Sequence, residues 1–70
     1  MEVYIALRSS PDYTAPPPSF VSAHETLKGA IEALYPDQLQ FQTAFRKWPD
    51  KDVWEGPDGF GLIRKVEVKL

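Results

Sequence analysis

The sequence contains no cysteine and only one histidine among its 70 residues. Without cysteine, neither disulfide bonds nor thiolate metal sites can form. His24 falls at the second position of an expected helix, close to solvent, and no serine stands at a spacing that suggests a nucleophile and its base. We therefore expect no catalytic residue, no cofactor and no enzymatic activity.

Acidic residues gather at Asp50, Asp52, Glu55 and Asp58. Acids at alternate positions can mark a calcium loop, but Trp54 occupies the third ligand position and no glutamate follows at the required distance. Aspartate is also favoured in turns for its own hydrogen bonding. These residues are expected to be solvated turn acids, and no metal site is predicted.

The chain also lacks a strong excess of either charge, with eight basic and ten acidic residues giving 8 − 10 = −2. Residues 1–40 carry two basic and five acidic groups and residues 41–70 carry six and five, so neither half is a polybasic patch. No apolar run approaches the roughly 20 residues needed to cross a bilayer, and the strand-like start has no signal-peptide pattern. We expect a soluble, cytoplasmic protein with no membrane partner and little attraction for nucleic acid.

What the sequence does contain is 43% hydrophobic residues, including two tryptophans, three tyrosines and four phenylalanines. A chain of this length buries only about 60% of the surface that it exposes when unfolded. One domain over residues 1–70 is therefore expected, with a thin core between two layers.

Alternating apolar side chains predict a first strand over residues 2–8. Val3, Ile5 and Leu7 share one face of it and are expected to point into the core. Residues 9–19 then hold four of the seven prolines, which excludes a helix and a central strand and predicts an extended loop. This loop is either a spacer or a polyproline ligand for an aromatic groove.

A capping box predicts that a helix begins at Ser22. The Ser22 hydroxyl can accept from the amide of Glu25, whose side chain can reach back to the Ser22 amide. Pro36 disfavours helical geometry at Tyr35, so the helix is expected to end there. The apolar stripe at helical spacing between these ends comprises Ala23, Leu27, Ala30, Ile31 and Leu34.

Three further strands are expected after the helix. Residues 38–48 alternate over a long stretch, residues 53–55 form a short strand, and residues 60–70 form the last one. Arg64 interrupts the expected inward pattern of the last strand, which predicts a bulge near residues 63–65.

The resulting element order is β-α-β-β-β. The turn between the last two strands ends at Gly59, which can adopt a positive φ. The sequence predicts an α+β fold in which one helix covers one face of a four-stranded, mostly antiparallel sheet. The other face of the sheet is left open.

Aromatic and basic residues are expected on that open face, where they would bind another protein or a second copy of the chain. Trp, Tyr and Arg are the residue types that most often dominate interface energetics. The alternative for both tryptophans is hydrophobic packing at the sheet edge. The candidate partner-binding residues are Tyr4, Arg8, Arg46, Trp48 and Trp54.

A weak single-stranded nucleic-acid binder is the alternative function. Val3-Tyr4-Ile5 and Gly59-Phe60-Gly61-Leu62-Ile63 resemble the two aromatic strand motifs with which RNA-recognition motif domains stack bases. Asp58 and Leu62 depart from that pattern, and no second helix follows. The residues that this function would use are Tyr4 and Phe60 for stacking and Arg8, Arg46, Arg64 and Lys65 for phosphates.

The chain as a whole resembles very short accessory proteins of bacteriophage and actinobacterial genomes. The resemblance lies in an opening strand like residues 1–5, a helix like residues 22–35 and a closing strand like residues 63–68. It implies a non-enzymatic protein, often of unassigned function, that binds a host or phage macromolecule. A phage-encoded modulator of a host protein is the specific form of this expectation.

Overall fold

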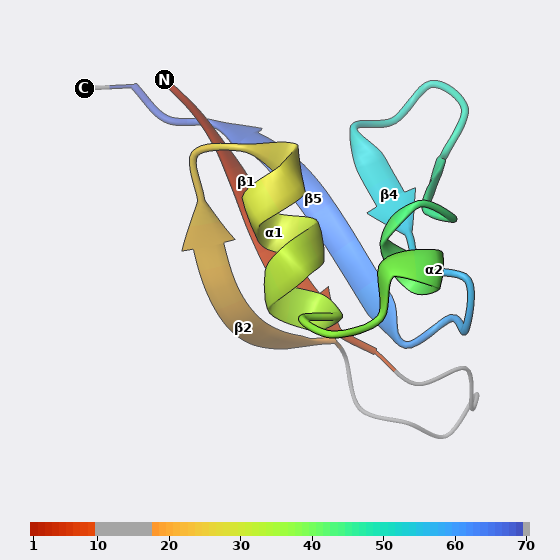
Figure 1. Ribbon diagram of the computed structural model, residues 1–70. Helices are drawn as coiled ribbons and strands as arrows, with labels where there is room; N and C mark the ends of the chain where they lie inside the picture. Colours follow the sequence, from red (N-terminus) through yellow and green to blue (C-terminus); the bar gives the residue numbers. More distant parts are fainter. Residues whose placement is uncertain (10–17, 70) are drawn as a thin grey trace.

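The computed structural model describes residues 1–9 and 18–69, which form one antiparallel sheet with the strand order β2-β1-β5-β4-β3 and two short helices (Figure 1). The α+β class is as expected, but these residues form five strands and two helices rather than four strands and one helix. The strands are β1 Glu2–Arg8, β2 Ser19–His24, β3 Arg46–Lys47, β4 Val53–Glu55 and β5 Gly61–Glu67. The helices are α1 Leu27–Leu34 and α2 Leu39–Gln42.

The predicted helix start at Ser22 is wrong, because residues 19–24 form strand β2 instead. Thr26 is the N-cap of α1, and its hydroxyl accepts a hydrogen bond from the Gly29 amide at 3.0 Å. The Ser22 hydroxyl is hydrogen-bonded at 2.7 Å to Nε2 of His24, at the end of the strand. Pairing with β1 satisfies the backbone of this segment and overrides its local capping signal.

The long strand expected over residues 38–48 is also wrong. The segment forms the single-turn helix α2 and, after a turn, the two-residue strand β3. Phe41 and Phe45 both contact the ring of Tyr35, at centroid distances of 5.5 and 5.6 Å. A hydrogen bond of 2.6 Å from Gln42 Nε2 to the Tyr35 carbonyl ties α2 to the end of α1. These contacts account for the helical turn.

The bulge predicted near residues 63–65 is absent, because β5 pairs without interruption with both β1 and β4. The register shift lies in the pairing of β1 with β2, where Ala6 is opposite Ser22 and Leu7 is opposite Phe20. Val21 is thus the extra residue of a β-bulge in β2.

The short strand β4 and the last strand β5 occur where the alternation predicts them, although β5 is shorter than residues 60–70. The turn between them contains Gly59 at a φ of 79°, as expected. The proline-rich loop of residues 9–19 falls mainly on residues 10–17, outside the described residues, and Ser19 belongs to β2. Among the described residues, no helix has the length and hydropathy to cross a membrane.

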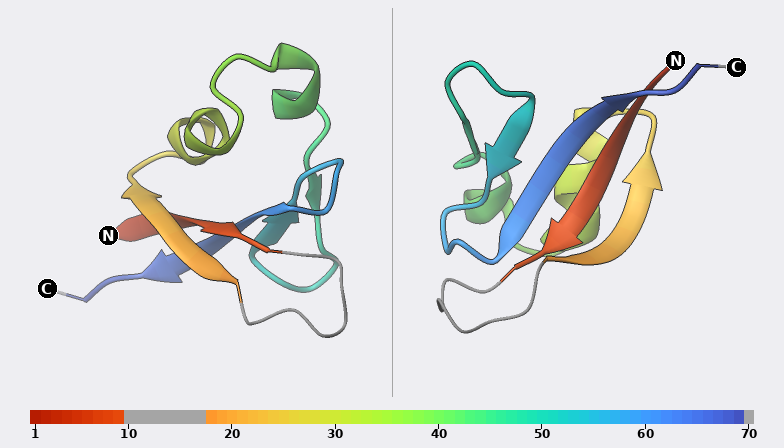
Figure 2. Two further views of the ribbon diagram at one scale, coloured as in Figure 1. Left: turned by 90° about the horizontal axis from the view of Figure 1, so that it is seen from below. Right: turned by 180° about the vertical axis from the view of Figure 1, so that it is seen from behind.

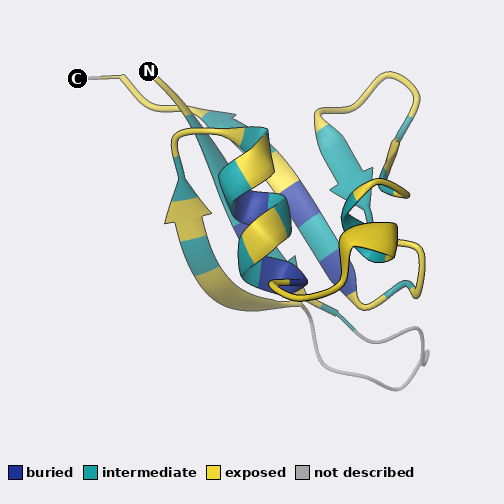
Figure 3. Cartoon of the chain, in the orientation of Figure 1, coloured by how far each residue is buried: buried dark blue, intermediate teal, exposed yellow. Residues whose placement is uncertain are grey.

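Both helices lie on the same side of the sheet, as the left view of Figure 2 shows. The core between the layers contains Ala6 and Ile63 from the sheet and Ala30, Leu34 and Tyr35 from α1 and its C-cap, all at most 3% exposed (Figure 3). The small side chains of Ala6 and Ala30 are both fully buried, which allows the helix to approach the sheet closely.

The prediction that Val3, Ile5 and Leu7 face the core is therefore wrong. Ala6 lies under α1, and side chains alternate along a strand, so the odd-numbered residues of β1 point to the side without helices. Ile63, opposite Ala6 in the register, is the inward residue of β5. The structure leaves the more aliphatic face of the sheet without a covering layer of described residues.

Candidate interaction surface

A continuous group of aliphatic side chains occupies the side of the sheet away from both helices. Directly paired residues of neighbouring strands share a face, so the outward side chains of β1 determine those of the strands beside it. Each outward residue of β1 is opposite an outward residue of β5, and β2 and β4 extend the row on both sides. We call this surface the aliphatic face; it comprises Val3, Ile5, Leu7, Phe20, Val53, Leu62 and Val66.

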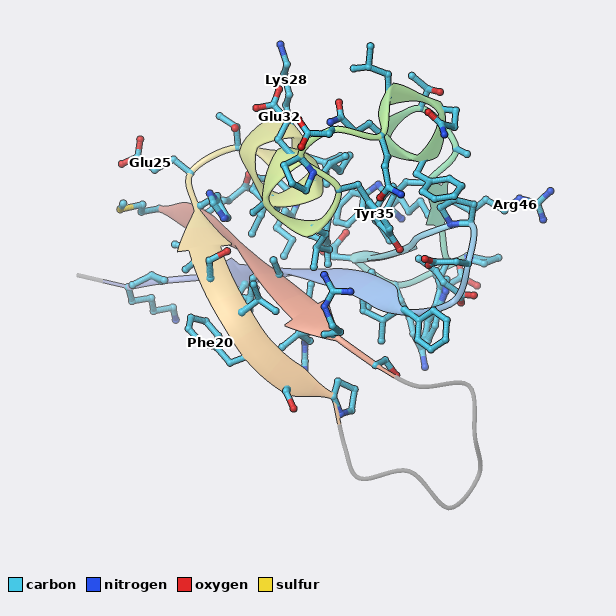
Figure 4. All side chains as sticks on the ribbon, turned by 60° about the horizontal axis from the view of Figure 1, so that its bottom comes forward. Phe20, Glu25, Lys28, Glu32, Tyr35 and Arg46 are labelled. Atoms are coloured by element: carbon cyan, nitrogen blue, oxygen red, sulfur yellow. The ribbon has the colours of Figure 1, made fainter. Side chains whose placement is uncertain are left out.

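Phe20 is the most exposed member of the aliphatic face, at 66%. Figure 4 shows its ring on the side of the sheet opposite to α1, whereas Tyr35 lies between the helices and the sheet. The other six members are half-buried by their neighbours within the sheet. A contiguous apolar surface of this kind is typical of an interaction site.

Two opposite charges lie on this same face. Arg64 is exposed and stands in the register between Ile5 of β1 and Val53 of β4. Glu55 is opposite Leu62, and its Oε1 accepts a hydrogen bond of 3.1 Å from Nε1 of Trp48. The face is therefore apolar overall but carries Arg64 in its midst and Glu55 near its β4 end, where Arg46 of β3 stands opposite Glu55 at the border of the face.

Arg46 and Trp48 lie on the helix-free side, as the sequence predicts. Arg46 is opposite Glu55 and exposed, and it extends away from the body of the molecule in Figure 4. The backbone amide of Trp48 bonds to the Val53 carbonyl at 2.8 Å, so the half-buried indole continues the face past β4. The Lys51 ammonium lies 5.9 Å from the centroid of this ring, a cation–π distance.

The other three predicted partner-binding residues lie on the helix side, so their placement on the open face is wrong. Tyr4 and Trp54 pack against the core, with ring centroids 5.8 Å apart. Arg8 donates from Nη2 to the Leu34 carbonyl at 3.4 Å, at the C-terminal end of α1. Tyr4 and Arg8 share the face of Ala6 because the alternation of β1 puts its even-numbered residues there, and Trp54 of β4 is opposite the inward-facing Ile63.

The six residues of the nucleic-acid alternative do not share one surface. Tyr4 and Arg8 are on the helix side, and Phe60, 42% exposed, lies in the turn before β5. Lys65 is also on the helix side, 3.4 Å from the Glu2 carboxylate, and Asp52 and Glu2 raise its pKa. Of the six, only Arg46 and Arg64 lie on the helix-free side of the sheet.

A hydrogen-bonded tyrosine–carboxylate pair, Tyr35 and Asp58, joins the end of α1 to the turn before β5. The Tyr35 hydroxyl donates to Asp58, which also accepts from the Phe60 amide at 3.0 Å. Burial, and then the hydrogen bond and negative charge of Asp58, raise the pKa of Tyr35 to about 12. For Asp58, partial desolvation is outweighed by these donors, so its pKa is lowered.

The sequence pattern does not reveal this pair, because the two residues are 23 positions apart. The available signal was a large aromatic residue directly before Pro36 at a helix end, together with three glycines within residues 56–61. A neutral tyrosine held by a carboxylate fastens the end of α1 to the turn before β5. Its role in this arrangement is structural.

Within residues 1–9 and 18–69, no cluster of three or more His, Asp or Glu side chains is arranged to hold a metal ion. Comparison of the chain with protein-family models, curated proteins and solved structures finds no match.

Proposed function

We propose that this chain is a non-enzymatic binding protein that acts by covering a surface of another protein, or of a second copy of the chain, with its aliphatic face. The observation that carries the proposal is that the helices cover the less aliphatic side of the sheet and leave the more aliphatic side uncovered. The sheet presents the small residues Ala6 and Gly61 to α1 and Tyr35, whereas valine, isoleucine, leucine and phenylalanine side chains lie on the uncovered side. Burial of apolar surface is favourable, so an apolar face that no other layer of the described residues covers favours association with a partner.

The same proposal places the protein in the cytoplasm as an accessory factor, and its most specific form is a phage-encoded modulator of a host protein. Arg46 and Trp48 at the border of the face support a protein partner, because both residue types are enriched among interface anchors. No observation favours the nucleic-acid alternative, since its stacking and phosphate-binding residues are distributed over different surfaces.

Affinity capture with matched variants tests this function. Phe20→Glu places a charge on the aliphatic face at a residue that is 66% exposed, and Leu39→Glu places one on α2 at a residue that is 73% exposed. We expect the tagged wild-type chain and Leu39→Glu to retain the same protein after nuclease treatment, and Phe20→Glu to lose it. Equal recovery by all three chains, or loss of recovery after nuclease treatment, would contradict the proposal.

A further inference from the structure

We propose that the occupant of the aliphatic face is a second copy of this chain, packed face to face around a two-fold axis. The inference rests on the proposed function, because it assigns a partner to the same surface. It is carried by the area of the face, by the size of the core, and by the two opposite charges that the face presents.

The area of the face fits a sheet-on-sheet dimer. β1 and β5 have seven residues each, so they are about 23 Å long, and four adjacent strands are about 19 Å wide. Two faces of this size bury on the order of 1,000 Å² of combined surface, which is what a specific interface requires. Two twisted sheets pack in this way when their inner faces carry interdigitating aliphatic side chains.

The core of one chain is thin, which favours a permanent partner over a transient one. Among the described residues, its buried apolar members are three large side chains and two alanines, and Ile63 is the one large side chain of these that is fully buried. A chain without cysteine cannot add disulfides, and oligomerisation is another of the common ways to stabilise so small a domain. A second copy is present wherever the chain itself is made.

The charges make the face complementary to itself. An Arg64 covered by apolar side chains alone would be an unpaired buried charge, which is strongly unfavourable. A two-fold axis makes each contact occur twice with the roles exchanged, so Arg64 of one copy can lie against Glu55 of the other in both directions. Glu55 already accepts from Trp48 through Oε1, and a carboxylate has further acceptor positions for a guanidinium.

Sedimentation velocity and light scattering of the purified chain over roughly 1 to 200 μM test the assignment. We expect a dimer whose dissociation constant rises about 100-fold or more in Arg64→Glu and in Glu55→Arg, because each places like charges together. The double variant Arg64→Glu/Glu55→Arg restores the pair with its polarity reversed, and should recover the dimer.

Matched controls lie on the outward side of α1, where Lys28 and Glu32 form an exposed i,i+4 pair (Figure 4). Lys28→Glu and Glu32→Arg repeat the two charge changes and should leave the dissociation constant unchanged. Glu55→Gln removes the charge but keeps an acceptor for Trp48, so weakened association with an unchanged near-UV spectrum separates lost pairing from misfolding.

A wild-type chain that stays monomeric over the whole range overturns the inference. A dimer that survives Arg64→Glu, or one that the double variant fails to restore, overturns the proposed pairing of Arg64 with Glu55. If the chain is monomeric while capture still depends on Phe20, the second-copy assignment fails and the binding function stands. If capture is also insensitive to Phe20→Glu, the binding function fails as well.

Discussion

At the scale of single residues, Tyr35 shows how space for one side chain is made by positions far away in the sequence. A Cβ atom at Gly61 would lie 2.9 Å from the Tyr35 hydroxyl oxygen, and one at Gly56 would lie 2.7 Å from it. Both distances are too short for any residue but glycine without movement of the ring. The hydroxyl therefore reaches Asp58 through a slot that two glycines leave open.

Removing this hydroxyl should lower stability in a pH-dependent manner. We expect Tyr35→Phe to lower the free energy of unfolding by about 2 kcal/mol near neutral pH, the usual net value of a hydrogen bond to a charged group. The pKa of Tyr35 is raised from 10.0 to about 12 by folding, so this contribution is complete below pH 10 and is lost as the pH rises towards 12. Urea unfolding of wild type and Tyr35→Phe from pH 10 to pH 12 measures the difference between their free energies of unfolding, which should become smaller as the pH rises.

The contribution of Asp58 to stability has the opposite pH dependence from that of Tyr35. The pKa of Asp58 is lowered by folding, so its contribution to stability is present above the ordinary carboxyl pKa and is lost as the pH falls through the folded-state pKa.

Tyr4→Phe is the control for Tyr35→Phe, because it removes a different hydroxyl from a ring that also packs against the core. A stability difference between wild type and Tyr35→Phe that stays constant from pH 8 to 12 would contradict the assignment, by the same linkage argument.

At the scale of elements, the beginning of α1 depends on one hydroxyl. Thr26→Ala removes the acceptor for the Gly29 amide and should lower the free energy of unfolding by about 1 kcal/mol, as loss of an N-cap does. Ser22→Ala is the matched control, because the Ser22 hydroxyl bonds to His24 within β2 and leaves the helix amides untouched. Chemical denaturation of the two variants compares them directly, and an unchanged free energy of unfolding in Thr26→Ala would contradict the assigned cap.

The strand pattern could be predicted where one face of a strand is plainly distinct from the other. β1 has the bounds that the alternation predicts, and β4 was located from three residues between two turns. β2 and α2 could not be located in this way, because their structure depends on partners distant in the chain. β2 pairs with β1, and α2 forms where Phe41 and Phe45 meet Tyr35.

The more consequential error of the sequence-based prediction concerns which face of the sheet the helix covers. Alternation shows which residues share a face, but it does not show which face a helix will cover. The covered face of β1 is the less apolar one, because it includes Glu2 and Arg8 at its ends, and steric fit favours it, since Ala6 and Gly61 leave room for α1 and Tyr35. Arg46 and Trp48 lie on the helix-free side, as predicted. Tyr4 and Trp54 were predicted there but lie on the helix side.

At the scale of the whole molecule, stability should depend on protein concentration if folding and association are coupled. A dimer that unfolds to separate chains has a melting temperature that rises with concentration, by about 5 °C for each tenfold increase in a chain of this size. Calorimetry at several concentrations measures this slope. Arg64→Glu should flatten it and Lys28→Glu should not, and a wild-type melting temperature independent of concentration would show that the chain folds alone.

The bulge at Val21 bears on how far such an assembly can grow. An outer strand with regular pairing can accept a strand from another molecule, and a sheet that accepts strands at both edges can extend without limit. In this molecule one outer strand, β2, is bent by an extra residue, and the other, β3, is two residues long. Neither edge is suited to pairing with a further strand, so the face-to-face association proposed above would end in a closed pair instead of a fibre.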